Sequence, residues 1–194
     1  MVIGDGVVRQ SPFNAQIMPE IFKCFFPLHN EFYDASFDNA LKVLKKMRIF
    51  EKNKMNLAIV NGPNLNLLGT REPGIYGSEN FEAYYEKLQE QYPQIHFSYF
   101  QSNVEGELIN ALQDFGFRTD GILLNAAAYT HTSVGLGDCI KAIDAPVLEI
   151  HISNTFARED FRHTSYITPV AKGLIVGFGL DSYRLGVESF LAAK

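Results

Sequence analysis

A glutamate and a histidine two positions apart make the most suggestive pair in the chain. Glu149 and His151 follow an apolar run that starts at Pro146, so both lie on one predicted strand over 146–150 or directly at its end. Side chains two residues apart on a strand point to the same face. A carboxylate beside an imidazole orients the ring and fixes its tautomer, which suits a general acid. Ser153 extends the same face; a purely structural His–Glu pair is the alternative.

A second polar group surrounds His131. It belongs to the segment 125–132, which starts at Asn125 and leads into a predicted helix. Backbone N–H groups at a helix start favour an anion such as a carboxylate. The alternative is that His131 or a neighbouring threonine only caps the helix. Asp138, seven residues later, is expected to face solvent or another subunit.

A charged run over 158–163 supplies two candidate ligands for an anionic substrate. Arg162 is the better candidate, because Arg158 is followed at once by Glu159 and Asp160. A solvated loop with no role in binding is the alternative.

The stretch 60–77 is too long and too broken to be a tight strand-to-helix turn. It holds three Asn, four Gly and two Pro, with Arg71 and Tyr76 near its far end. A strand-to-helix connection usually takes about 2–6 residues, and longer ones are often functional. We therefore expect an active-site loop. Tyr76 alone would be a surface tyrosine, and its interest comes from Arg71 in the same loop.

The sequence lacks the motifs of several common binding sites and reactions. Asn61-Gly62-Pro63-Asn64 is neither a phosphate-binding loop with a following Gly-Lys-Ser/Thr nor a dinucleotide-binding glycine pattern. No Cys/His cluster has metal-ligand spacing, and no serine lies in a nucleophile elbow. The remaining residues favour acid–base chemistry without a metal or other cofactor.

Strands and helices alternate from Met55 onward. Apolar runs predict strands over 57–60, 95–101, 121–124, 146–150 and 174–176, with the second at a sheet edge. Helical spacing predicts helices over 80–92, 104–115, up to about 143 after the 125–131 loop, and from 182; Asn80 and Asn103 are the expected caps. This order predicts an α/β fold, a flavodoxin-like doubly wound five-stranded parallel sheet with helices on both faces.

That fold explains why the polar residues matter. In such sheets, ligands bind outside the carboxyl ends of the strands, where the strand order switches. Asn61, Asn125 and His151 end the first, third and fourth predicted strands. We therefore expect them to gather at one edge.

The length, composition and net charge of the chain are typical of an ordinary globular protein. The chain has 194 residues, 46% hydrophobic residues and a net charge of -5, so nucleic acid is not an expected partner. No apolar run approaches the roughly 18 residues of a membrane helix, and the start does not read as a signal peptide. Cys24 and Cys139 are isolated, which favours a reducing compartment, and we expect a cytoplasmic protein.

Residues 1–54 differ from the rest. Short apolar pieces alternate with Gly and Pro, and a helix is predicted near 36–50. We interpret this N-terminal extension as an appended or poorly ordered segment; a partner- or oligomer-binding arm is the alternative. A third hypothesis is that Met55 is the natural start.

Residues 55–194 resemble type II 3-dehydroquinate dehydratase along their whole length, while residues 1–54 lie outside the resemblance. The matching motifs are Asn61-Gly62-Pro63-Asn64-Leu65, Arg71-Glu72-Pro73 with Tyr76-Gly77, Thr130-His131-Thr132-Ser133, Glu149-Ile150-His151-Ile152-Ser153-Asn154, Ala157-Arg158-Glu159, Phe161-Arg162 and Ser165-Tyr166.

The resemblance implies a fold, a reaction and roles. The family has the flavodoxin-like fold, uses no cofactor and typically assembles as a dodecamer of four trimers. It removes water from 3-dehydroquinate to give 3-dehydroshikimate, in aromatic biosynthesis or quinate breakdown. Tyr76 matches the base and Arg71 the residue that favours the tyrosinate. His151 matches the general acid with Glu149 behind it, and Asn64 helps to hold a water near the enolate oxygen.

The resemblance also implies a binding set and a partner subunit. Asp138 matches a carboxylate that reaches a neighbouring subunit's site. A free tyrosine has a pKa of about 10, so only ~0.1% would be ionised at pH 7, and a guanidinium such as Arg71 would lower that pKa. The substrate-contacting positions are Asn125, His131, Ile152, Ser153 and Arg162.

Two departures and two rivals complete the expectations. The family commonly has glycine at Ala127; if this backbone needs either a positive φ or a close approach of substrate, the added methyl would strain it. Gly135 and Gly137 lie in a predicted helix, where each costs about 1 kcal/mol of helix propensity. One rival is a non-catalytic or flavin-binding domain. The other is a Schiff-base dehydratase that uses Lys87, Lys141 or Lys172.

Overall fold

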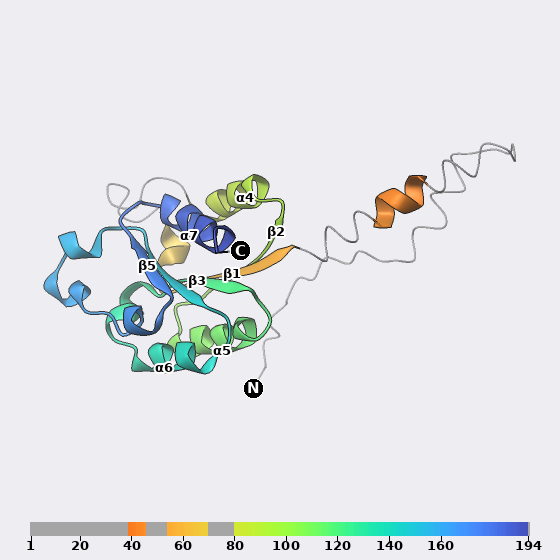
Figure 1. Ribbon diagram of the computed structural model, residues 1–194. Coiled ribbons are helices and arrows are strands. Elements are labelled where there is room, and N and C mark those ends of the chain that lie inside the picture. Colours follow the sequence, from red (N-terminus) through yellow and green to blue (C-terminus); the bar gives the residue numbers. More distant parts are fainter. Residues whose placement is uncertain (1–38, 46–53, 70–79, 194) are drawn as a thin grey trace, which may run out of the picture. The chain divides into compact units, whose positions relative to one another are not determined.

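A computed structural model of the protein describes residues 39–45, 54–69 and 80–193 (Figure 1). The chain divides into two units, residues 1–48 and 49–194. In the first unit, residues 39–45 are helical, inside the predicted helix 36–50, and Leu41, Val43 and Leu44 are exposed. The rest of that prediction lies outside the described residues.

The second unit is built on five parallel strands. They are β1 (Met55–Asn61), β2 (Ile95–Gln101), β3 (Gly121–Asn125), β4 (Val147–His151) and β5 (Gly173–Val176). Their order in the sheet is β2-β1-β3-β4-β5, with β2 at an edge as predicted. All neighbouring strands pair in parallel. The predicted doubly wound α/β sheet is confirmed, and its strand order switches between β1 and β3.

Helices cover both faces of the sheet (Figure 1). α4 (Phe81–Gln91) and α7 (Asp181–Leu191) lie over one face, and α5 (Glu105–Gly116) and α6 (Val134–Ala142) over the other. Alternate residues of β1 point to opposite sides: Leu57 and Ile59 join the first core, Ala58 and Val60 the second. A strand buried on both faces must be apolar at every position, which explains the continuous apolar run.

The connections after β1, β3 and β4 contain short 3-10 helices. These are η1 (Leu65–Leu67), η2 (Ala127–His131), η3 (Thr155–Ala157), η4 (Asp160–His163) and η5 (Thr168–Val170). η1, η2, η3 and η4 follow the carboxyl ends of strands, at the edge where the polar side chains were expected, whereas η5 leads into the amino end of β5.

One of the two predicted helix caps is confirmed and the other is wrong. Asn80 caps α4 as predicted, since its side chain accepts a hydrogen bond from the backbone of Ala83 at 2.8 Å. Asn103 does not cap α5: the Ser102 hydroxyl accepts from the backbone N–H of Val104, and the Val104 side chain is 55% exposed. The Asn103 side chain instead accepts a hydrogen bond from the backbone of Asn64, at the pocket described below.

The helix predicted after the 125–131 loop is α6, and the loop itself contains η2. η2 ends at His131, and α6 starts three residues later with Ser133 as its cap. His131 therefore precedes the helix as predicted, and the alternative that it or a neighbouring threonine caps the helix is wrong. Gly137 also has a packing reason: a Cβ there would lie 2.7 Å from the carbonyl oxygen of Tyr166, so glycine lets α6 approach that segment.

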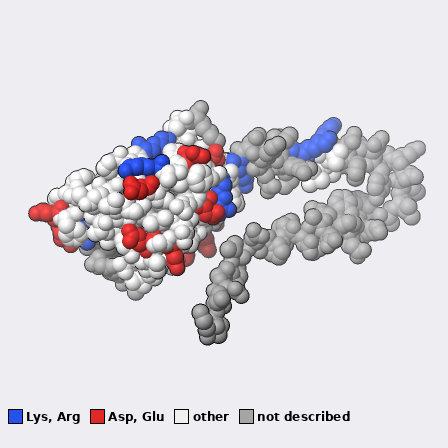
Figure 2. Space-filling model, turned by 90° about the horizontal axis from the view of Figure 1, so that it is seen from below, with Lys and Arg blue, Asp and Glu red and all other residues white. Residues whose placement is uncertain are grey.

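Within the described residues, no helix has the length and apolar character needed to cross a membrane. Figure 2 shows the α5–α6 side of the molecule, where acidic and basic side chains are interspersed among neutral ones. This is the pattern of an ordinary solvated surface.

Candidate active site

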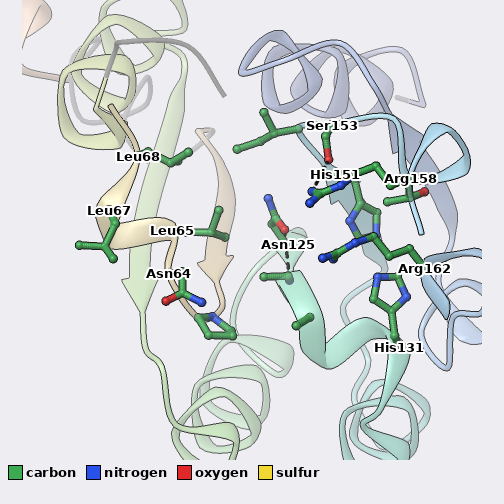
Figure 3. Close-up of a pocket in the computed structure, with 15 residues that line it drawn as sticks. Asn64, Leu65, Leu67, Leu68, Asn125, His131, His151, Ser153, Arg158 and Arg162 are labelled. Atoms are coloured by element: carbon green, nitrogen blue, oxygen red, sulfur yellow. Dashed lines mark hydrogen bonds between the residues drawn. The ribbon is translucent and has the colours of Figure 1, made fainter. Parts of the chain in front are cut away.

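A pocket opens at the carboxyl edge of the sheet, where the expected residues meet (Figure 3). Its volume is about 130 Å³, bounded by the residues that the structure describes. β1, β3 and β4, with the segments that follow them, all contribute to it. Seven predicted site residues line it, namely Asn64, Asn125, His131, His151, Ile152, Ser153 and Arg162.

The floor of the pocket between β1 and β3 is held by a buried neutral network. The Tyr183 hydroxyl donates to Asn61 Oδ1 at 2.8 Å and accepts from Asn125 Nδ2 at 2.9 Å. Asn125 Oδ1 accepts from the backbone N–H of Ala127 at 3.2 Å, so its amide orientation is fixed. Burial is the main reason that the pKa of Tyr183 lies far above its ordinary value, which keeps the hydroxyl protonated. Asn61 Nδ2 has no hydrogen-bond partner among the described residues.

Asn64 is positioned by backbone geometry. The Gly62 N–H donates to the Asn125 carbonyl at 2.7 Å, and a Cβ on Gly62 would lie 2.6 Å from the Ala126 carbonyl oxygen. Only glycine allows the two strand ends to approach this closely. Asn64 then adopts a left-handed conformation with φ of 66°, and its N–H donates to Asn103 Oδ1 at 2.9 Å.

Ala127 has φ of 50°, in the region that favours glycine. The positive φ, one of the two conditions for the expected strain, is therefore present. Ala127 lines the pocket two residues after Asn125, so the unusual backbone belongs to the site.

The predicted contact between Glu149 and His151 is present. His151 Nε2 lies 2.8 Å from Glu149 Oε1, and the two side chains are 9% and 0% exposed. His151 lines the pocket, whereas Glu149 lies behind it. Burial alone would raise the pKa of Glu149, but hydrogen bonds from His151, Thr130 and Thr168 outweigh burial and hold that pKa below its ordinary value.

An ionised Glu149 fixes the tautomer of His151. A carboxylate only accepts hydrogen bonds, so His151 Nε2 carries the hydrogen between them. In the neutral ring the other nitrogen, Nδ1, then carries no hydrogen and is the atom that can take up a proton.

His131 stacks on the His151 ring, with centroids 6.2 Å apart and planes 15° from parallel. Its Nδ1 lies 2.7 Å from the carbonyl oxygen of Thr164, so Nδ1 must be the donor. Burial first, and then the nearby charges of His151 and Arg162, lower the pKa of His131 despite the opposing hydrogen bond to Thr164. A neutral His131 therefore offers Nε2 as an acceptor.

Two guanidinium groups stand at the pocket. Arg162 Nε donates to Glu159 Oε2 at 2.7 Å, whereas Arg158 Nε lies 3.5 Å from the same oxygen. Arg158 also donates to the Ser153 hydroxyl at 3.4 Å. The ground for preferring Arg162 is therefore wrong, because Glu159 lies closer to Arg162, and both arginines line the pocket. Together they suit an anionic group such as a carboxylate.

The other four predicted site residues are Glu149, which lies behind the pocket, Asp138, Arg71 and Tyr76. Arg71 and Tyr76 lie outside the described residues. Asp138 is exposed on α6 and pairs with Lys141 at 3.1 Å. Its expected role in a neighbouring subunit's site stays a prediction.

Sequence reasoning missed residues that act behind the lining. Tyr183 orients Asn125, Asn103 holds the backbone of Asn64, and three hydroxyls surround Glu149. These partners are 16 to 58 positions away from the residues they hold, so no local spacing marks them. The only sequence feature that pointed to any of these partners was the Ser165-Tyr166 motif of the family resemblance.

The lysines of the Schiff-base alternative do not line this pocket. Lys141 pairs with Asp138, and Lys172 lies over the Phe190 ring with its Nζ 4.7 Å from the centroid. No group of three or more His, Cys, Asp or Glu with metal-binding geometry occurs in the described ranges.

Fold and site together define a doubly wound α/β domain with an acid–base pocket at the strand-order switch. Comparison with known proteins makes this more specific. Residues 55–191 match the family model described as "Dehydroquinase class II". The chain belongs to this family.

Its relatives cover the same part of the chain. A 3-dehydroquinate dehydratase from Prochlorococcus marinus (strain NATL1A) is 46% identical over 140 residues, which are 71% of this chain and 97% of that protein. One from Exiguobacterium sp. (strain ATCC BAA-1283 / AT1b) is 49% identical over 138 residues, 71% of this chain and 94% of the relative. The type II dehydroquinase of Butyrivibrio crossotus, a crystal structure, is 41% identical with a TM-score of 0.69, covering 71% of this chain and 98% of that one.

Proposed function

We propose that this protein is a lyase, a type II 3-dehydroquinate dehydratase that removes water from 3-dehydroquinate to give 3-dehydroshikimate. The observation that carries the proposal is the pair of His151 and buried Glu149, which opens onto a pocket with two arginines. Family membership names the substrate that such a pocket would take. The reaction belongs to the shikimate pathway or to quinate breakdown.

The mechanism we propose is trans elimination through an enolate. Tyr76, as a tyrosinate favoured by Arg71, removes the proton from the carbon beside the ketone. His151 donates a proton to the departing hydroxyl, with Glu149 orienting the ring. Asn64 holds a water near the enolate oxygen. No cofactor is required, because the chemistry needs only proton transfers.

Substrate binding follows from the donors and acceptors around the pocket. We infer that the guanidinium of Arg162, with that of Arg158, pairs with the substrate carboxylate. Asn125, Ser153 and neutral His131 supply hydrogen bonds to hydroxyl groups, and Ile152 lines the pocket wall. Such a set of convergent polar groups is typical of a site for a small polar ligand.

Three expectations remain part of the proposal. The homo-oligomer is a dodecamer of four trimers, in which Asp138 reaches a neighbouring site. The enzyme works in the cytoplasm. The N-terminal extension, residues 1–54, lies outside the catalytic domain 55–194, and comparing the size and activity of the full chain with a chain starting at Met55 tests its role.

The test is a dehydratase assay of the full chain, in which rising ultraviolet absorbance reports formation of the conjugated enone. Tyr76→Phe should lose at least about 100-fold in kcat, since it removes the general base. Tyr85→Phe is the matched control, because Tyr85 donates to the Phe97 carbonyl on α4's side of the sheet and does not line the pocket. Near-normal activity of Tyr76→Phe would exclude the tyrosinate mechanism.

Two outcomes would favour the rivals instead. A yellow purified protein that binds flavin and does not turn over 3-dehydroquinate would indicate a flavin-binding domain. Inactivation by borohydride only in the presence of substrate would indicate a Schiff-base lysine.

A further inference from the structure

Glu149 is fully buried and receives hydrogen bonds from four side chains. Its Oε1 accepts from His151 Nε2 at 2.8 Å, from the Thr130 hydroxyl, and from the Ser165 hydroxyl at 3.1 Å. Its Oε2 accepts from the Thr168 hydroxyl and lies 3.3 Å from Ser165 Oγ. We call Thr130, Ser165 and Thr168 the hydroxyl clamp.

The direction of the Ser165 hydrogen bond is determined by its backbone contacts. Ser165 Oγ accepts from the N–H groups of Ile167 at 3.0 Å and Thr168 at 2.9 Å. A hydroxyl has two acceptor lone pairs and one hydrogen. Because both lone pairs are occupied, the single hydrogen is left for Glu149, with Thr130 Oγ1 further away at 3.3 Å.

A protonated Glu149 does not fit this arrangement. It would have to donate its own hydrogen, and Ser165 cannot accept it because both of its lone pairs are already used. Thr130 or Thr168 would then have to turn its hydroxyl hydrogen away and give up the bond it now makes to the carboxylate, which is unfavourable for a carboxyl that is 0% exposed.

We propose that the hydroxyl clamp keeps Glu149 ionised, so that His151 always presents Nε2–H to Glu149 and exchanges its catalytic proton through Nδ1. Thr130, Ser165 and Thr168 are then positioning residues, which act on the reaction through Glu149 and His151. The inference rests on the proposed function of His151 as general acid.

The effect of other charged groups on the ionisation of Glu149 must be distinguished from the effect of the hydroxyl clamp. The cavity behind the pocket, beside Glu149, is also lined by His131, His151, Arg162 and His163. Each of these is neutral or cationic, so their charges also favour the carboxylate. Substitutions that remove a hydroxyl while leaving these four residues unchanged isolate the clamp.

The experiment uses the full chain and two substitutions, Thr168→Val and Ser165→Ala. Infrared difference spectra over a pH titration follow the carbonyl stretch of a protonated buried carboxyl, which is assigned to Glu149 by its absence in Glu149→Gln. The same proteins are assayed with 3-dehydroquinate to give the pH dependence of kcat. Thermal melts and size measurements identify any variant that fails to fold.

Each lost hydroxyl should raise the pH at which the carboxyl band appears by about one unit, since hydrogen bonds to charged groups are among the stronger ones. The acidic limb of kcat should move in the same direction. Thr168→Ser, which keeps the hydroxyl, should restore both values. Thr119→Val is the matched control, because that hydroxyl donates to the Phe115 carbonyl before the amino end of β3.

The two proposals fail in different ways. An unchanged infrared titration in folded Thr168→Val and Ser165→Ala would overturn the clamp, whatever the activity. A shifted titration in a protein without dehydratase activity would support the clamp's hold on Glu149 and overturn the proposed function. A shift that Thr119→Val reproduces would also overturn the clamp, because it would show a general effect of losing a hydroxyl.

Discussion

Two buried polar networks lie under the same pocket, and they differ in charge. The neutral one joins Asn61, Tyr183 and Asn125 at the ends of β1 and β3. The charged one joins Glu149 to His151 and three hydroxyls at the end of β4. The first fixes the position of an amide that lines the pocket, whereas the second holds a histidine and a buried carboxylate whose pKa lies below its ordinary value. Under the proposed function, one sheet edge would thus separate substrate binding from acid–base chemistry.

The largest effect is expected from Glu149→Gln. The glutamine amide brings hydrogens toward a set of donors, so a buried hydrogen-bond network is broken at its centre. We expect a loss of about 3 kcal/mol in the free energy of unfolding and at least about 100-fold in kcat. Chemical denaturation and the dehydratase assay measure these.

Glu188→Gln is the control for this substitution. Glu188 is exposed and accepts one hydrogen bond, from the Tyr92 hydroxyl at 2.5 Å. It should change stability by less than about 1 kcal/mol. If Glu149→Gln behaved like Glu188→Gln, the charged network would have no special role.

The pH dependence of stability should also distinguish the networks. The pKa of Glu149 is lower in the folded than in the unfolded protein. The contribution of the ionised carboxylate to the free energy of unfolding is therefore complete above the unfolded pKa and is lost as pH falls through the folded pKa. The stability difference between wild type and Glu149→Gln should therefore shrink as the solution is acidified below about pH 4.5. Denaturation curves at a series of pH values measure this difference.

Breaking the neutral network should have a smaller effect. Tyr183→Phe leaves Asn61 Oδ1 and Asn125 Nδ2 without their shared partner, which should cost about 1–2 kcal/mol. Because the Asn125 amide is then held only by the backbone N–H of Ala127, KM should rise several-fold while kcat changes little. Steady-state kinetics and denaturation test this.

Tyr85→Phe controls for the loss of a tyrosine hydroxyl elsewhere, and it should leave KM unchanged. The stability loss in Tyr183→Phe should also be the same at pH 4 and pH 7, because no carboxylate takes part in that network. A loss that depended on acid would contradict the contrast between the two networks.

The smallest expected effect concerns the backbone that supports Asn125. Ala127 has φ of 50°, which costs an alanine about 1–2 kcal/mol. Glycine removes that strain, but a chain with glycine loses more conformational entropy on folding. The free energy of unfolding of Ala127→Gly should therefore rise by about 0.5 kcal/mol. Thermal melts measure the gain.

Ala111→Gly is the matched control in the interior of α5, where the same change should destabilise by about 1 kcal/mol. A loss of stability in both variants would show that Ala127 is not strained.

Much of this molecule could be predicted from local pattern. Continuous apolar runs predicted buried parallel strands, helical spacing predicted the covering helices, and the switch-point rule placed Asn125 and His151 at one edge. Glu149 and His151 were expected to touch because strand geometry alone puts alternate residues on one face.

Only the tertiary structure decided the rest. The partners of Asn125 and Glu149 lie on α7, η2 and the segment around η5, and those contacts exist only after the helices pack on the sheet. Local spacing predicts that Asn103 caps a helix, but in the folded protein its side chain accepts a hydrogen bond from the backbone N–H of Asn64 in the segment after β1. The sequence by itself determined which residues stand at the edge, because the periods of strands and helices are local. Folding decided which groups hold them, because a hydrogen bond between distant residues has no period along the chain.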